Sequence, residues 1–110
     1  MTVMDGKAFQ ERILTAGETV LVEYFAPWCG YCRRIGPGME QLARKYEGRL
    51  AVAGINIDDE PELADREQIE LVPTVVLYHR GQAVDCLVAP DSKARIEALI
   101  VKYLEEGEVS

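Results

Sequence analysis

Two cysteines three positions apart, Cys29 and Cys32, are the residues of this chain best suited to chemistry. A C-x-x-C pair beside a strand-helix-strand pattern is typical of thiol–disulfide exchange. A helical stripe of apolar residues runs through residues 30–47, so Cys29 falls where that helix begins. The free N–H groups and positive dipole end of a helix N-terminus stabilise a thiolate over a thiol. We therefore expect Cys29 to be the nucleophile and Cys32, one turn further on, to close a disulfide with it.

Other interpretations of the cysteine pair are open at this point. Cys29 and Cys32 could form half of a zinc site that His79 and Cys86 complete, although the chain has no second C-x-x-C. They could also be two structural cysteines at a helix start. Three cysteines are not the even, spread set of a secreted disulfide scaffold. For His79 and Cys86 we expect ordinary roles, a histidine at the surface end of a strand and a cysteine packed within one.

The length and composition are those of a single globular domain. The chain has 110 residues, of which 48% are apolar and 28% charged, so it is not disordered. Its longest apolar runs have four residues, whereas a membrane helix needs roughly 20. The net charge of −7 would repel the phosphate backbone of a nucleic acid. The first residues lack the charged and apolar segments of a signal peptide, so we expect a cytosolic protein.

The apolar periodicity predicts helices alternating with strands. We expect helices from a cap at Asp5 to near Gly17, over 30–47, over 61–68 and from 90 onward, and strands over 19–26, 50–57, 73–79 and 83–88. Pro37 should kink the second helix, and the tail Glu105 to Ser110 should be frayed. Strands separated by helices should run parallel, while the turn at Arg80-Gly81-Gln82 should make the last two strands an antiparallel hairpin. The predicted fold class is α/β, a central mixed sheet with helices on both faces.

Several segments resemble the thioredoxin superfamily. These are the run Val22-Glu23-Tyr24-Phe25-Ala26-Pro27-Trp28-Cys29-Gly30-Tyr31-Cys32, then Pro37, then Asn56-Ile57-Asp58, Val72-Pro73-Thr74 and Tyr78-His79-Arg80-Gly81. The resemblance covers essentially the whole chain. It implies that residues 1–110 form one thioredoxin-like domain.

The resemblance also implies a substrate-binding set around the sulfurs. Pro73 matches the family's cis-proline beside the two cysteines, and Val72 matches the residue whose backbone pairs with the substrate. Trp28 matches the tryptophan that flanks the substrate site, and Gly30 and Tyr31 lie between the cysteines. Without the resemblance, Pro73 could simply begin a strand and Trp28 could be an ordinary surface aromatic residue.

Glu23 matches the buried acid that lies behind the second cysteine of the family. A carboxyl group in an apolar strand, between Val22 and Tyr24, should be desolvated, which raises its pKa. Glu23 is then a candidate proton acceptor for Cys32. The alternative is a strand acid that points into solvent.

The chain departs from ordinary thioredoxins at four positions. Tyr31 stands where they have proline, and Glu23 where they have aspartate. Gly54 stands where they have a lysine beside the buried acid, and Ala89 replaces a glycine that shapes the substrate groove. Because proline has no N–H, Tyr31 restores a backbone donor that can point toward the Cys29 sulfur.

These residues predict a cytoplasmic thiol–disulfide oxidoreductase that reduces protein disulfides. Cys29 would attack the substrate, and Cys32, assisted by Glu23, would release it. The implied partners are disulfide-containing proteins and a recycling reductase, which the resemblance suggests is thioredoxin reductase. We expect no metal, organic cofactor, nucleic acid or membrane to take part. An isomerase or oxidase, and a binding or chaperone module that keeps the fold, are the alternatives.

Overall fold

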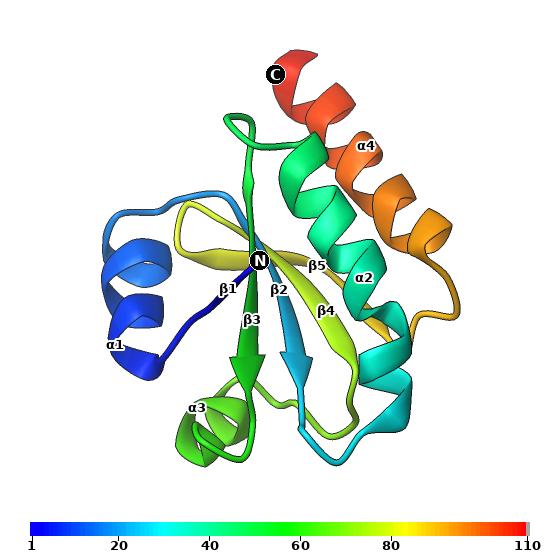
Figure 1. Cartoon of the computed structure of the whole chain (residues 1–110). Helices are drawn as coiled ribbons and strands as arrows, with labels where there is room; N and C mark the ends of the chain where they lie inside the picture. The colour runs from blue at the N-terminus through cyan, green and yellow to red at the C-terminus, as the bar shows by residue number, and fades with distance from the viewer. Residues whose placement is uncertain (110) are drawn as a thin grey trace.

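A five-stranded mixed sheet lies at the centre of the computed structural model, which describes the backbone of residues 1–109 and the side chains of residues 1–105 (Figure 1). The strand order is β1-β3-β2-β4-β5. The strands are β1 (Thr2–Val3), β2 (Val20–Phe25), β3 (Ala51–Asn56), β4 (Thr74–His79) and β5 (Gln82–Val88). The mixed sheet is as predicted, but β1 was missed because two residues are too few to show a period.

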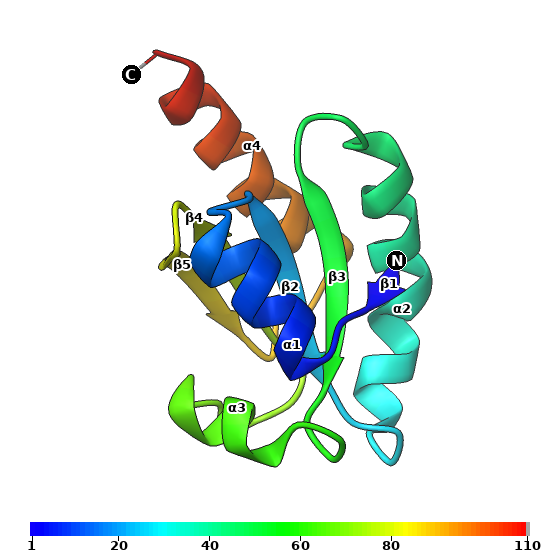
Figure 2. The ribbon, with the colours of Figure 1, turned by 90° about the vertical axis from the view of Figure 1, so that its left-hand side faces the viewer.

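Helices cover both faces of the sheet, which confirms the predicted fold class (Figure 2). They are α1 (Gly6–Ala8), the π-helical segment η1 (Phe9–Thr15), α2 (Gly30–Lys45), α3 (Pro61–Arg66) and α4 (Lys93–Val109). On one face, α2 and α4 bury a core that includes Leu21, Leu42 and Ile100. On the other face, Phe9 and Tyr24 belong to a second core beneath α1, η1 and α3.

Strand β4 runs antiparallel to β2, which corrects the prediction that all strands separated by helices run parallel. Helix α2 has 16 residues and returns the chain along the sheet, so β2 and β3 are parallel. Helix α3 has six residues and is only about 9 Å long. It lies beyond the end of β3, as Figure 1 shows, so the chain re-enters the sheet at the end where it left.

The predicted ends of the elements are close to the observed ones. Asp5 caps the first helix, because its carboxylate accepts a hydrogen bond from Ala8 N–H at 2.8 Å. Pro37 lies inside α2 without ending it. The backbone of α4 is helical to Val109, while the side chains after Glu105 and the whole of Ser110 lie outside the described residues, so the expected fraying of Glu105 to Ser110 stays a prediction. No helix in the described part of the chain is long and apolar enough to cross a bilayer.

Candidate active site

Cys29 lies at the junction between β2 and α2, where the sequence predicts the nucleophile. It is the N-cap residue of α2, with extended backbone angles of φ −87° and ψ 105°. Its sulfur accepts a hydrogen bond from Cys32 N–H at 3.2 Å. Cys29 is 7% exposed, so only a small part of it is open to solvent. The helix end and the N–H group both stabilise negative charge on this sulfur.

The backbone donor to this sulfur is Cys32 N–H and not Tyr31 N–H, which corrects the role expected for Tyr31. An N-cap side chain accepts from the second or third residue of its helix, and here Cys32 is the third. Tyr31 instead donates its hydroxyl to the carbonyl of Pro90 at 2.7 Å. Pro90 was not predicted as a site residue, because a backbone acceptor has no sequence signature.

Cys32 lies deeper than Cys29 and is 5% exposed. Burial, then the hydrogen bond with Cys29 and the charges of Cys29 and Glu23, together raise the pKa of the Cys32 thiol to about 12. Cys32 is therefore a thiol at neutral pH.

Glu23 is 2% exposed, which excludes the solvent-facing alternative. It lies in the middle of the sheet, opposite Gly54 of β3 and Val75 of β4. Burial raises the pKa of its carboxyl group from 4.5 to about 7. Its buried Oε2 has no hydrogen-bond partner among the described residues. Glu23 can therefore both hold and release a proton near neutral pH.

Gly54 leaves no space for a side chain beside Glu23. A Cβ atom at this position would lie 2.9 Å from Cε1 of Phe25 and 3.2 Å from Cε of Met1. The lysine that ordinary thioredoxins have at this position would require these two side chains to move. The acid is consequently not accompanied by a cation from β3 at this position.

The Val72–Pro73 peptide bond is cis, as the resemblance implies, and Pro73 is buried. The Val72 carbonyl oxygen lies 3.7 Å from Cys29 Sγ. Segments 43 residues apart in the sequence thus meet at the reactive sulfur. Val72 therefore borders the Cys29 sulfur, and the cis-proline follows it directly.

Trp28 lies on the surface beside Cys29, with 65% of its side chain exposed. Its indole Nε1 donates to Oδ1 of Asp58 at 3.3 Å, which orients the ring. Gly30, the first residue of α2, is also exposed. An exposed aromatic face next to a nucleophile can pack against a bound chain.

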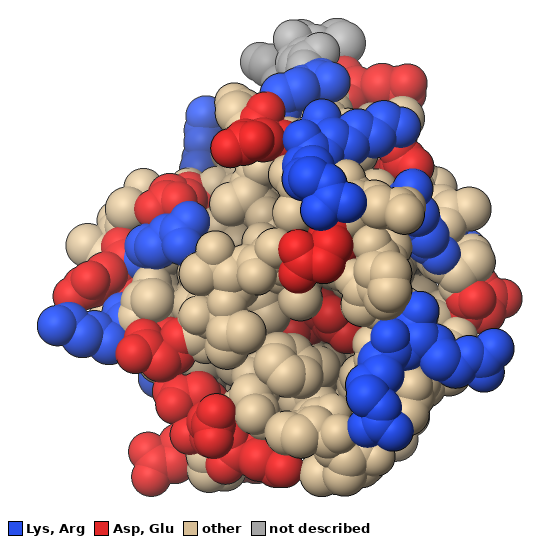
Figure 3. Space-filling view, in the orientation of Figure 1, with Lys and Arg blue, Asp and Glu red and all other residues tan. Residues whose placement is uncertain are grey.

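Charges of opposite sign gather on the two sides of this site. Figure 3 shows basic residues over α2 and acidic residues over α3. Arg33 donates to the carbonyl of Pro27 at 2.7 Å, and the Arg34 guanidinium lies 6.0 Å from the centre of the Tyr31 ring. The basic side is therefore next to the cysteine pair.

His79 and Cys86 lie away from the cysteine pair, so the four-residue zinc set is not assembled. His79 ends β4, about 17 Å along the strand from Thr74, and its Nδ1 contacts the hydroxyls of Thr19 and Tyr103 at 2.7 and 2.8 Å. The described residues contain no cluster of His, Cys, Asp and Glu that could hold a metal.

Cys86 is exposed, which corrects the expectation that it packs within its strand. It lies on β5, the edge of the sheet, opposite Val76 of β4. An edge strand is flanked by only one neighbour, and here the side chains of β5 are mostly open to solvent. Partial burial and the charge of Asp85 nonetheless raise the pKa of this thiol.

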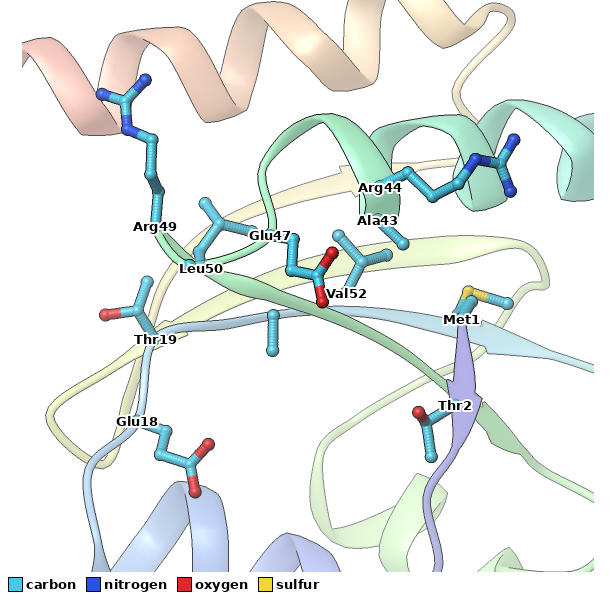
Figure 4. Close-up of a pocket in the computed structure, with 12 residues that line it drawn as sticks. Met1, Thr2, Glu18, Thr19, Ala43, Arg44, Glu47, Arg49, Leu50 and Val52 are labelled. Atoms are coloured by element: carbon cyan, nitrogen blue, oxygen red, sulfur yellow. The ribbon is translucent and has the colours of Figure 1, made fainter.

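A hollow of about 610 Å³ lies at the other end of the sheet from Cys29 (Figure 4). It lies between the end of α2 and the start of β3, and Glu18, Arg44 and Leu50 are among the residues that line it. No cysteine lines it. The cysteine pair thus lies outside this hollow.

This chain is similar in sequence to several known proteins. The Thioredoxin family model matches residues 1–102. Thioredoxin 1 from Nostoc sp. is 34% identical over 96 residues, which cover 87% of this chain and 90% of that protein. Thioredoxin from Synechocystis sp. is 35% identical over 97 residues, covering 88% and 91%. The mitochondrial thioredoxin of Mus musculus is 34% identical over 102 residues, covering 93% and 61%. The residues that the family model matches include the cysteine pair and all five strands of the described sheet.

Proposed function

Because this chain belongs to the thioredoxin family, it is a thiol–disulfide oxidoreductase, and we propose that it reduces protein disulfides by dithiol exchange through Cys29 and Cys32. The observation that carries the proposal is the difference between the two sulfurs. The Cys29 sulfur lies at a helix N-terminus and accepts the Cys32 N–H, whereas Cys32 is a buried thiol beneath it. An attacking and a resolving thiol need this difference.

In the first step, the Cys29 thiolate attacks one sulfur of a substrate disulfide. A bond forms between Cys29 Sγ and that sulfur, and the substrate S–S bond breaks. The other substrate sulfur leaves with the electron pair as a thiolate. The proposed binding surface comprises Trp28, Gly30, Tyr31, Val72 and Pro73, which surround the Cys29 sulfur and can hold the substrate chain.

In the second step, Cys32 loses its proton to Glu23 and attacks the Cys29 sulfur. The Cys29–Cys32 disulfide forms, and the second substrate sulfur leaves as a thiolate. The hydrogen bond and charge of Cys29, which raise the pKa of Cys32, both disappear once Cys29 is held in the mixed disulfide. Glu23, with a pKa near 7, can then take the proton directly or through a water molecule.

The oxidised protein must regain two electrons and two protons before its next cycle. We assign this task to a recycling reductase, thioredoxin reductase by family resemblance. The cycle uses only cysteine sulfur, so the proposal includes no metal and no organic cofactor.

We place the reaction in the cytoplasm, where the thiol pool keeps such a pair reduced. The known relatives include chloroplastic and mitochondrial thioredoxins, so the chemistry itself is not tied to one compartment.

Insulin reduction by dithiothreitol tests the proposal. The wild-type protein should accelerate precipitation of the insulin B chain, and Cys29→Ser should remove the acceleration. Cys86→Ser is the matched control, because this exposed thiol lies on the edge strand, and it should be as active as wild type. Faster oxidation of a reduced protein than reduction of insulin would favour the oxidase or isomerase alternative. No acceleration by the wild type, together with binding of unfolded chains, would favour the binding module.

A further inference from the structure

The Tyr31 side chain connects the turn that bears Cys29 and Cys32 to a segment distant in the sequence. Its hydroxyl donates to the Pro90 carbonyl at 2.7 Å, across 59 positions of sequence. Tyr31 lies between the two cysteines in the first turn of α2, and Pro90 lies in the connection between β5 and α4. The bond therefore joins the turn that bears Cys29 to this connection.

The same connection also holds the cis-proline segment. Ala89 N–H donates to the carbonyl of Pro73 at 2.8 Å. Ala89 adopts a left-handed conformation, with φ of 47°, and this turns the chain between its two contacts. Two adjacent residues, Ala89 and Pro90, thus hold the cysteine turn through one bond and Pro73 through the other.

These two bonds set the relative position of the two segments that meet at the reactive sulfur. The Cys29 sulfur and the Val72 carbonyl are in direct contact at 3.7 Å, so a bound polypeptide must lie across both of them. A polypeptide disulfide has to fit against both segments at once. A small disulfide needs only to reach the sulfur.

We infer that Tyr31 is a positioning residue that favours polypeptide disulfides over small ones, because its hydroxyl binds the Pro90 carbonyl and, through the adjacent Ala89, fixes Cys29 relative to Val72 and Pro73. The inference rests on the proposed function and names a determinant of its substrate class. A proline at position 31 would have no hydroxyl and could not form the hydrogen bond to the Pro90 carbonyl.

Tyr31→Phe removes the hydroxyl and keeps the ring, and Tyr46→Phe is its matched control. Tyr46 also lies at α2 and donates its hydroxyl to Glu97 of α4 at 2.7 Å, far from the cysteine turn. For each protein we would measure kcat/KM with a peptide disulfide and with hydroxyethyl disulfide. The ratio of the two constants should fall about threefold to tenfold in Tyr31→Phe, the loss typical of one hydrogen bond, and should not change in Tyr46→Phe.

Amide hydrogen exchange at Ala89 gives a readout that does not depend on activity. The Ala89 N–H donates to the Pro73 carbonyl. Loss of the hydrogen bond between Tyr31 and the adjacent Pro90 should therefore speed the exchange of this N–H in Tyr31→Phe and not in Tyr46→Phe. Equal losses on both disulfides, an unchanged ratio, or unchanged Ala89 exchange would each overturn the inference. If the wild type reduced neither disulfide, the proposed function would fail, which is a different result.

Discussion

The charge of the Glu23 carboxylate raises the pKa of the Cys32 thiol, so the acid and the resolving cysteine act on each other inside the protein. Both are nearly inaccessible, at 2% and 5% exposure. Burial is the largest cause of both raised pKa values, and the Glu23 charge adds to that of Cys32. Transfer of the Cys32 proton to Glu23 lets the thiol ionise without two negative charges forming in the buried site. The arrangement suits a thiol that must stay protonated until a mixed disulfide has formed.

The two cysteines should behave differently when each is replaced by serine. Cys32→Ser keeps the attacking sulfur but cannot resolve the intermediate, so it should accumulate a mixed disulfide with substrate. Cys29→Ser should accumulate none. Non-reducing electrophoresis and mass spectrometry after incubation with a disulfide-containing protein would measure this. Accumulation by Cys29→Ser alone would reverse the assigned roles.

Glu23→Gln should slow release of the mixed disulfide at neutral pH by at least about tenfold, because an amide cannot accept the Cys32 proton. In the wild type, the release rate should also fall as pH drops through about 7, where Glu23 becomes protonated. Stopped-flow fluorescence of Trp28, the single tryptophan, can follow the step. Glu47→Gln, an exposed glutamate after α2, is the control and should match wild type. A wild-type rate in Glu23→Gln would mean that Cys32 uses another acceptor.

The burial of Glu23 should make wild-type stability depend on pH. Its pKa is about 7 in the folded protein, above the ordinary value of 4.5. Below pH 4.5 the group is neutral in both states, so burial of charge costs nothing. As pH rises from 4.5 to 7, the unfolded chain ionises first, and the free energy of unfolding should fall by up to about 3 kcal/mol.

Glu23→Gln should lack this pH-dependent loss of stability. The difference in unfolding free energy between the variant and wild type therefore separates the contribution of Glu23 from those of all other titrating groups. Urea unfolding of both proteins at pH 4.5, 6, 7 and 8 gives the measurement. The advantage of the variant should grow with pH and level off above 7. A constant difference across this range would show that the ionised carboxylate is compensated in the folded protein.

Ala89→Gly should stabilise the fold by about 0.5–1 kcal/mol. Ala89 has φ of 47°, a conformation that costs an L-residue about 1–2 kcal/mol and costs glycine nothing, although glycine loses more entropy on folding. Ala83→Gly is the control, because Ala83 lies in the extended strand β5, and it should be destabilising. Chemical denaturation compares the two variants. A less stable Ala89→Gly would mean that the Ala89 methyl group makes contacts that outweigh the strain.

The sequence by itself determined the local parts of this protein. The cysteine pair at a strand–helix junction, the acid within the apolar run around Glu23 and the turn at Arg80 and Gly81 were all predictable. Each depends on residues within about one turn or one strand of one another, and periodicity reports such short-range relations. The protonation of Glu23 was predictable in direction for the same reason, because its apolar neighbours in β2 implied burial.

The tertiary structure alone decided which distant segments meet. It reversed the expected direction of β4, because α3 is too short to return the chain along the sheet. It left Cys86 exposed, because nothing in the described residues covers most side chains of β5. It brought the Tyr31 hydroxyl to Pro90, an acceptor in the backbone that any residue could provide. Strand order, edges and backbone acceptors arise from packing over the whole chain, and so no local pattern of side chains specifies them.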